Sequence, residues 1–312
     1  MHVTNTSFSN NFLYDIQQLE SQQSTLQKQS TTGLKVTLPE DDPSAMNQVL
    51  NLQTEAGANT QYQSNITQVQ DSATTASDAL NSLQTLVEQA GEIATDANGV
   101  TSSTQLSTYA TQVGQLIQQA LQIANTKDAN GNYIFAGTDT GAAPFAAATD
   151  SSGNVTAVTY SGNTSTAKSE IAPGLTVTAQ IPGENNTGSG AEGLFADSRT
   201  GADIFSHLIA LQQDLTAGDT SAISSTDSPN LTKDEDHVVT QISGNAVLQS
   251  TLEAAGNVAS QNATSIDTEM SDDTSADMAT TLTQLSQTET TYEAALESGT
   301  MVMNTSLVNF LE

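Results

Sequence analysis

The chain lacks cysteine and tryptophan, and it has few aromatic or basic residues. Aromatic side chains make up 4% of its 312 residues, and six Lys and Arg stand against 35 Asp and Glu, for a formal net charge of −29. The missing cysteines exclude disulfides, thiolate catalysis and Cys-ligated metals. The scarcity of aromatic residues argues against one large, dense core, although long helix pairs can still bury Ala and Leu along thin seams.

The acidic balance also excludes classes of partner. Nucleic acid phosphates require a basic face, and an anionic membrane surface attracts basic segments, so neither is an expected partner. No stretch approaches the ~20 apolar residues of a membrane span. Residues 1–10 show neither a basic start nor an apolar run, so we expect no secretory signal peptide and, if the protein is exported, a route that reads none.

Both ends of the chain carry a helix-length apolar seam with alternating steps of four and three residues. The first seam has a polar step at Gln23, and the last one has a polar step at Glu289. A seam this narrow suits a helix that pairs with another helix, and it predicts assembly rather than catalysis. The apolar seam positions are Phe12, Ile16, Leu19 and Leu26 at the start, and Met278, Leu282, Leu285, Tyr292, Leu296, Gly299 and Met303 at the end.

Between the terminal seams the pattern predicts further helices. Gly33 should end a first helix over residues 8–32, and Asp42 and Pro43 should cap and open a long helix to about residue 97. Its later part keeps a heptad rhythm through Ile66, Val69, Ala73, Ala76, Leu80, Leu83, Val87 and Ala90. A shorter helix, a helix over 203–215 and a loop over 217–229 should follow. A second long helix should then span 233–270, with its apolar positions at Val238, Ile242, Val247, Leu252, Val258 and Ile266. We expect Ser271, Asp272 and Asp273 to cap the final helix.

A segment rich in Gly, Thr, Ser and Asn interrupts the helices from residue 130 to about 193. It holds short β-type runs at 133–135, 155–160 and 175–181, with turns at Asn130-Gly131 and Gly153-Asn154. The predicted fold is mainly α with a β-rich insertion, built as a long-helix bundle with coiled-coil character and discontinuous domains. The predicted domains are terminal assembly helices (1–40 with 271–312), a bundle core (41–129 with 203–270) and an outer β-rich insertion (130–202).

Candidate catalytic and metal sites all have simpler explanations. The run Asp128 to Asn132 resembles a calcium loop, but it has Tyr133 at the position that requires Gly and Asp139 at the position that usually holds Glu, so a turn is favoured. The three histidines lie far apart in the sequence, and we expect them on the solvated surface. Helix capping explains the Asp41-Asp42 and Asp272-Asp273 pairs better than a hydrolase pair. We therefore expect no enzyme activity, no metal and no cofactor.

Two segments carry a family resemblance. Residues 30–43, which include Gly33, Lys35 and the run Asp41-Asp42-Pro43, resemble the junction "S-T-G-K-R-V-x-x-P-x-D-D-P" of flagellin-like axial proteins of the bacterial flagellum. Tyr133, Ile134, Phe135 and Gly137, followed by Pro144 and Phe145, look like a signature of the hook–filament junction members of that family. Leu34 departs from the pattern where a basic residue is usual, although Lys35 keeps one positive charge there. The resemblance covers the whole chain in layout.

The resemblance implies a structural adaptor that forms a ring between hook and filament by axial helix packing. It implies other copies, flagellin and a hook-side junction protein as partners, together with a flagellar export chaperone. It also implies export by the flagellar type III pathway to an extracellular location, and terminal helices that fold on assembly. One alternative is a short flagellin that forms the filament itself. Another is a secreted enzyme with its site in the β insertion, for which the sequence shows no ligand cluster.

Overall fold

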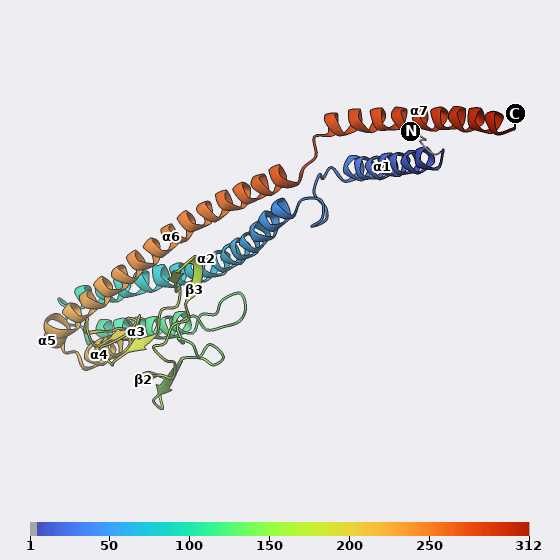
Figure 1. The fold of residues 1–312 in the computed structure, drawn as a ribbon. Helices are drawn as coiled ribbons and strands as arrows, with labels where there is room; N and C mark the ends of the chain where they lie inside the picture. Colours follow the sequence, from blue (N-terminus) through green and yellow to red (C-terminus); the bar gives the residue numbers. More distant parts are fainter. Residues whose placement is uncertain (1–4, 312) are drawn as a thin grey trace. The chain divides into compact units, whose positions relative to one another are not determined.

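A computed structural model describes residues 5–311 of the chain, and side chains over residues 10–301. The fold is mainly helical, with small sheets between α3 and α4, as the sequence predicts (Figure 1). It divides into two compact units, Met1–Ala58 with Asn262–Glu312, and Asn59–Gln261. We call these the terminal unit and the central unit. The long helices α2 (Pro43–Ala97) and α6 (Ser228–Thr274) contribute residues to both.

The terminal unit is built around α1 (Asn5–Thr32) and α7 (Met278–Leu311), which lie side by side in Figure 1. The two helices are antiparallel, because the contacts run in opposite directions along the sequence: Leu34, just after α1, bridges to Ser275, while the earlier residue Glu20 accepts a hydrogen bond from the later residue Tyr292. Gly33 has a φ of 73° and ends α1, as predicted. Asp42 also caps α2 as predicted, because its Oδ1 accepts hydrogen bonds from the amides of Ser44 and Ala45.

The central unit has its main core between α2, α3 (Ser103–Ala124), α4 (Ile204–Ala217) and the first turns of α6. The predicted heptad of α2 is confirmed, since every one of its eight positions is buried: Ile66, Val69, Ala73, Ala76, Leu80, Leu83, Val87 and Ala90. Alanines on this face let neighbouring helices approach closely. Ala73 and Ala90 are fully buried.

Amide side chains link α2 to α6 in the central unit. Asn59 Nδ2 donates to Ala259 O at 2.8 Å, and Asn245 Nδ2 donates to Ala73 O at 2.9 Å. The face of α6 that meets α2 therefore includes the buried Asn245 with Leu252 and Ala259. The prediction that Val247 and Val258 share the apolar seam of α6 is wrong. They are 67% and 54% exposed, because the amide-bearing face, and not the valine face, turns toward α2.

The small sheets lie between α3 and α4, in the segment predicted as β-rich. They are an antiparallel pair β1 (Phe145–Thr149) and β2 (Val155–Tyr160), an antiparallel pair β3 (Ser169–Ala172) and β4 (Leu175–Val177), and a third sheet in the order β5-β6-β7. The last three strands are Glu184–Asn185, Ala196–Asp197 and Ala202–Asp203. Residues 133–135 do not form the predicted strand. Only Tyr133 makes a bridge, to Lys127, before the chain turns at Gly137.

Two predicted boundaries also differ. The expected loop over 217–229 is helical, with α5 (Thr220–Ala222), a π turn η1 (Ile223–Asp227) and then α6. Asp219 starts this helical run by accepting a hydrogen bond from the Ala222 amide. Asp272 and Asp273 do not cap the final helix, because α6 continues through them to Thr274. Asp277 caps α7 instead, and accepts from the amides of Ala279 and Thr280. Among the described helices, none is long and apolar enough to cross a membrane.

Candidate assembly site

The facing sides of α1 and α7 form a narrow seam. On α1, Ile16 and Leu26 are buried, and Phe12, Leu19 and Gln23 are half-buried. On α7 the covered positions follow steps of four and three residues: Thr281, Leu285, Thr288, Tyr292, Ala295 and Gly299. Tyr292 donates a 2.8 Å hydrogen bond to Glu20 Oε1 across the pair, which raises the pKa of Tyr292. The seam thus combines small apolar contacts with the cross-helix hydrogen bond from Tyr292 to Glu20.

The predicted seam residues fall on different sides of the terminal helices. Phe12, Ile16, Leu19 and Leu26 face α7, and Leu285 and Tyr292 face α1. Leu282 and Leu296 are 50% and 42% exposed, on a neighbouring line of α7 together with the 39% exposed Met278. Met303 lies in α7, but its side chain is outside the described residues. The role of these positions in assembly stays a prediction.

Sequence reasoning missed the buried threonines of the α7 seam. Thr281 and Thr288 are 5% and 6% exposed. The Thr288 hydroxyl donates to Gln284 O within its own helix, which satisfies the polar atom and leaves the methyl group to pack. The spacing of Thr281, Leu285 and Thr288 is the signal that could have found them, because it repeats the four- and three-residue steps of the α1 seam and shares Leu285 with the predicted line.

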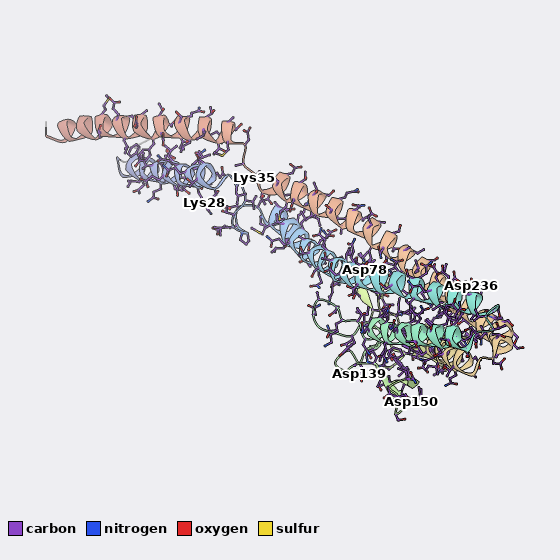
Figure 2. The ribbon with its side chains drawn as sticks, turned by 180° about the vertical axis from the view of Figure 1, so that it is seen from behind. Lys28, Lys35, Asp78, Asp139, Asp150 and Asp236 are labelled. Carbon is purple, nitrogen blue, oxygen red and sulfur yellow. The ribbon has the colours of Figure 1, made fainter. Side chains whose placement is uncertain are left out.

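Residues 33–42 join α1 to α2 and pair with the α6–α7 connection. Lys35 N donates to Thr274 O at 2.7 Å, and Ala276 N donates to Gly33 O at 2.8 Å. Lys35, labelled in Figure 2, also places its Nζ 2.9 Å from Asp272 O in the last turn of α6. A cation is favourable at this end of a helix, where free carbonyls concentrate negative partial charge. Lys35 therefore links the two chain connections as well as capping α6.

The adjacent carboxylates at the start of α2 have separate structural roles. Asp41 Oδ2 accepts from the amides of Thr37 and Leu38, and these hydrogen bonds lower the pKa of Asp41. Asp42 caps the helix, and Pro43 occupies its first position, where a missing N–H costs nothing. The residues of the predicted junction motif thus form a turn that starts α2.

The Tyr133–Phe145 motif forms part of an aromatic cluster in the central core. Phe135 is fully buried and meets Phe195 edge to face, with ring centroids 5.6 Å apart. Phe145 contacts Phe195, Phe205 and Tyr160 at centroid distances of 5.0–5.4 Å. Asn125, which sequence reasoning missed, holds Phe145 by donating to its carbonyl and accepting from its amide.

The other motif residues shape the chain around this cluster. Gly137 has a φ of 69°, and a Cβ there would collide with Asn163 O, so the turn requires glycine. Pro144 is buried, and its carbonyl accepts from Ser161 N at 2.8 Å. Tyr133 stacks under the Lys127 ammonium, and Ile134 N bonds Thr126 O. The described residues of this motif therefore serve core packing and turn formation.

The two histidines in the described part of the chain are not on the solvated surface, contrary to expectation. His207 Nδ1 lies 2.8 Å from Oδ2 of Asp234, which is fully buried. Burial lowers the pKa of His207, but the hydrogen bond and charge of Asp234 outweigh it, so that the pKa ends above its ordinary value. Burial raises the pKa of Asp234 in turn. His237 Nε2 bonds Gly193 O, while His2 lies outside the described residues.

The carboxylate-rich loops are turns, as predicted. Asp128 Oδ1 accepts from the amides of Asn130 and Asn132. Asp150, at the β1–β2 hairpin in Figure 2, makes the same pair of bonds to residues 152 and 154. Within the described residues, no group of three or more His, Cys, Asp or Glu side chains is placed to hold a metal ion. The candidate functional site is therefore the seam between α1 and α7, together with the exposed apolar residues Met278, Leu282 and Leu296 beside it on α7.

Known proteins match this chain in sequence and in fold. Residues 3–140 match the family model of the bacterial flagellin N-terminal helical region. The chain is 36% identical over 125 residues to flagellar hook-associated protein 3 of Salmonella typhimurium, and 36% identical over 119 residues to that of Escherichia coli. The matched segments cover 40% and 38% of this chain. They span only 39% and 38% of the relatives' lengths.

Solved structures share the fold at lower identity. A putative flagellar hook-associated protein from Vibrio parahaemolyticus superposes with a TM-score of 0.64 at 20% identity, over 75% of this chain and 100% of that one. FlgL of Bacillus cereus follows with a TM-score of 0.57 at 16% identity, over 71% of this chain and 99% of that one. The chain is therefore similar in sequence to flagellar hook-associated protein 3 over 40% of its length, and its residues 3–140 match the bacterial flagellin N-terminal helical region.

Proposed function

We propose that this chain is a structural adaptor of the bacterial flagellum, which forms the junction ring between hook and filament by axial packing of its terminal helices. The observation that carries the proposal is the exposed apolar line on α7. Met278, Leu282 and Leu296 lie there beside the seam that α1 covers. Leu282 and Leu296 are two heptads apart on one side of the helix, and this spacing suits a further helix from another copy.

The three-part division predicted above fits this role. In the proposal the terminal helices assemble, the long-helix bundle supports them, and the β-rich insertion lies outward. The partners are other copies, flagellin on one side and the hook-side junction protein on the other, and an export chaperone binds the chain before export. The protein acts outside the cell after type III export. Its relatives are named as flagellar proteins, which supports a structural rather than an enzymatic role.

The names of the relatives favour a role at the hook–filament junction over a role as the filament subunit. Both curated relatives are hook-associated proteins, so a short flagellin is the second candidate. Deleting the gene separates the two. We expect hooks without filaments and flagellin monomer released into the medium. If deletion instead removes the major filament subunit itself, the filament assignment is correct and the junction assignment is wrong.

The exposed line on α7 can be tested in the same strain. We expect a Leu282→Ser, Leu296→Ser double variant to be exported but to leave the filament detached, because both leucines are exposed and α1 does not cover them. Leu175→Ser is the matched control, since this leucine is 45% exposed on β4 in the central unit. Normal swimming and filament attachment in the double variant would contradict the role of this line.

A further inference from the structure

The tetrapeptide Asp-Ala-Asn-Gly occurs twice in the central unit. It spans residues 96–99, where α2 ends, and residues 128–131, in the loop that follows α3. In both copies the asparagine precedes a glycine, and these are the two Asn-Gly steps of the chain. Both asparagines are exposed, so contact with water does not distinguish them. A difference in their chemistry would therefore report on the local fold.

The second copy is a closed turn. Gly131 N donates to Asp128 O at 3.0 Å, and Asp128 N donates to Asn132 O at 2.9 Å. Asp128 Oδ1 also accepts from the amides of Asn130 and Asn132, both at 2.9 Å. The glycine amide is thus occupied, and Asp128 holds the backbone on both sides of the Asn130 side chain.

The first copy leaves its glycine amide available. Asn98 N donates to Thr95 O at 3.2 Å, and Val100 N donates to Ala97 O at 3.1 Å, so the backbone on either side of the glycine is bonded to the end of α2. Within the described residues, the Gly99 amide between them donates no hydrogen bond, and the Asn98 carboxamide makes none. The same four residues therefore present a free glycine N–H at one site and a bonded one at the other.

This difference matters because the glycine nitrogen is the nucleophile when an Asn-Gly step loses ammonia. The Gly99 nitrogen gives up its proton to water and attacks Cγ of Asn98. A bond forms between these two atoms, the bond from Cγ to Nδ2 breaks, and ammonia leaves with a proton taken back from water. Water then opens the resulting succinimide ring at either carbonyl, which yields aspartate or isoaspartate. A glycine N–H that is donated to a carbonyl must first break that hydrogen bond.

We propose that Asn98 is a site of spontaneous deamidation at the α2–α3 connection, and that the Asp128 turn protects Asn130 from the same reaction. Conversion of Asn98 adds a carboxylate to a chain whose formal net charge is already −29. The isoaspartate product also inserts the β-carbon into the backbone, between the amides of Asn98 and Val100 that bond the end of α2. The turn that joins α2 to α3 is therefore lengthened at its centre.

Mass spectrometry of the full chain after prolonged incubation tests the proposal. Trypsin cleaves after lysine and places the two sites on separate peptides, residues 36–127 and 128–168. In the folded chain at neutral pH we expect Asn98 to convert about tenfold faster than Asn130, because the bonds of the second turn must open before Gly131 N can attack. In urea the two rates should converge, because both sites then present the same tetrapeptide. Equal rates in the folded chain, or an unchanged difference in urea, would overturn the proposal.

Matched variants separate the two turns. Asp128→Ala removes the side-chain acceptor of the second turn and should raise the rate at Asn130 toward that at Asn98. Asp96→Ala is the control, since Asp96 has the same place in the tetrapeptide but lies in the last turn of α2, and it should leave both rates unchanged. Gly99→Ala should slow conversion at Asn98, because a Cβ on the attacking residue crowds the ring, although it meets open space in the fold. If Asp128→Ala leaves Asn130 slow, or if Asp96→Ala speeds it equally, the protection by the turn is refuted; a Gly99→Ala chain that converts at the wild-type rate would refute attack by the glycine nitrogen.

Discussion

Removing the hydroxyl of Tyr160 isolates one polar contribution to the aromatic cluster. The Tyr160 oxygen lies 3.0 Å from Phe135 O and 3.1 Å from Asn163 O, and it accepts from Gly183 N at 3.2 Å. One O–H can donate once, so Tyr160→Phe removes one donated and one accepted hydrogen bond. Gly183 N keeps its 2.7 Å bond to Phe135 O, so no amide is left without a partner.

The expected loss is therefore moderate. Each net hydrogen bond contributes about 0.5–1.5 kcal/mol, so we expect Tyr160→Phe to lower the free energy of unfolding of the central unit by about 1–2 kcal/mol. Urea unfolding of the full chain, followed by far-UV circular dichroism, measures it as a shift in the midpoint of the transition of that unit. The ring stays in place, so its contact with Phe145 at 5.0 Å should survive.

A matched substitution controls for the loss of a phenol. Tyr133→Phe removes a hydroxyl for which the described residues provide no hydrogen bond, while its ring keeps the contact with Lys127. We expect it to change stability by less than about 0.5 kcal/mol, as is usual for changes that touch no specific interaction. Equal effects of the two variants, or no effect of Tyr160→Phe, would refute the reasoning.

Four further predictions concern the helices and their assembly. Gly91→Ala should raise stability by about 0.5–1 kcal/mol, because its Cβ would meet open space. Gly299→Ala should instead reduce the thermally stable helix of the terminal unit in circular dichroism, because its Cβ would collide with the Phe12 ring. Asp42→Ala should cost about 1 kcal/mol in urea unfolding through loss of the α2 cap, and Asp42→Asn should lose much less. Assembly of purified chains should strengthen with added salt, measured by light scattering, because copies with a net charge of −29 repel one another; weakening with salt would contradict the apolar contact.

The sequence was sufficient to predict the helices and much of the local geometry around them. Asp42 and Pro43 start α2, and Gly33 ends α1, because capping and backbone conformation depend on a few neighbouring residues. The heptad of α2 was readable because buried Ala and Leu recur along one helix face at constant steps. These features need no knowledge of what lies across the interface.

The prediction from sequence was incomplete in one respect: it did not identify which face of each helix packs against the neighbouring helix. The amide face of α6 meets α2 because Asn245 finds the carbonyl of Ala73 there, and Val247 is left exposed. On α7, Thr281 faces α1 while Leu282 does not, a difference of one residue in the line that is covered. Hydrophobicity alone favours the opposite choice at both places. It registers neither the hydrogen bond that Asn245 gains from α2 nor the bond within its own helix that lets a threonine such as Thr288 be buried.

The sequence by itself thus determined the helical architecture, the presence of apolar seams on the terminal helices, the helix ends at Gly33 and Asp42, and the family resemblance. Only the tertiary structure decided which line of α7 is covered, how the Phe135 and Phe145 motif packs, and that Asp234 is buried beside His207. The physical reason is the separation along the chain of the residues that interact. Helix periodicity and capping act over a few residues of one chain segment, whereas burial, ring packing and side-chain hydrogen bonds depend on groups that the fold brings together from distant segments.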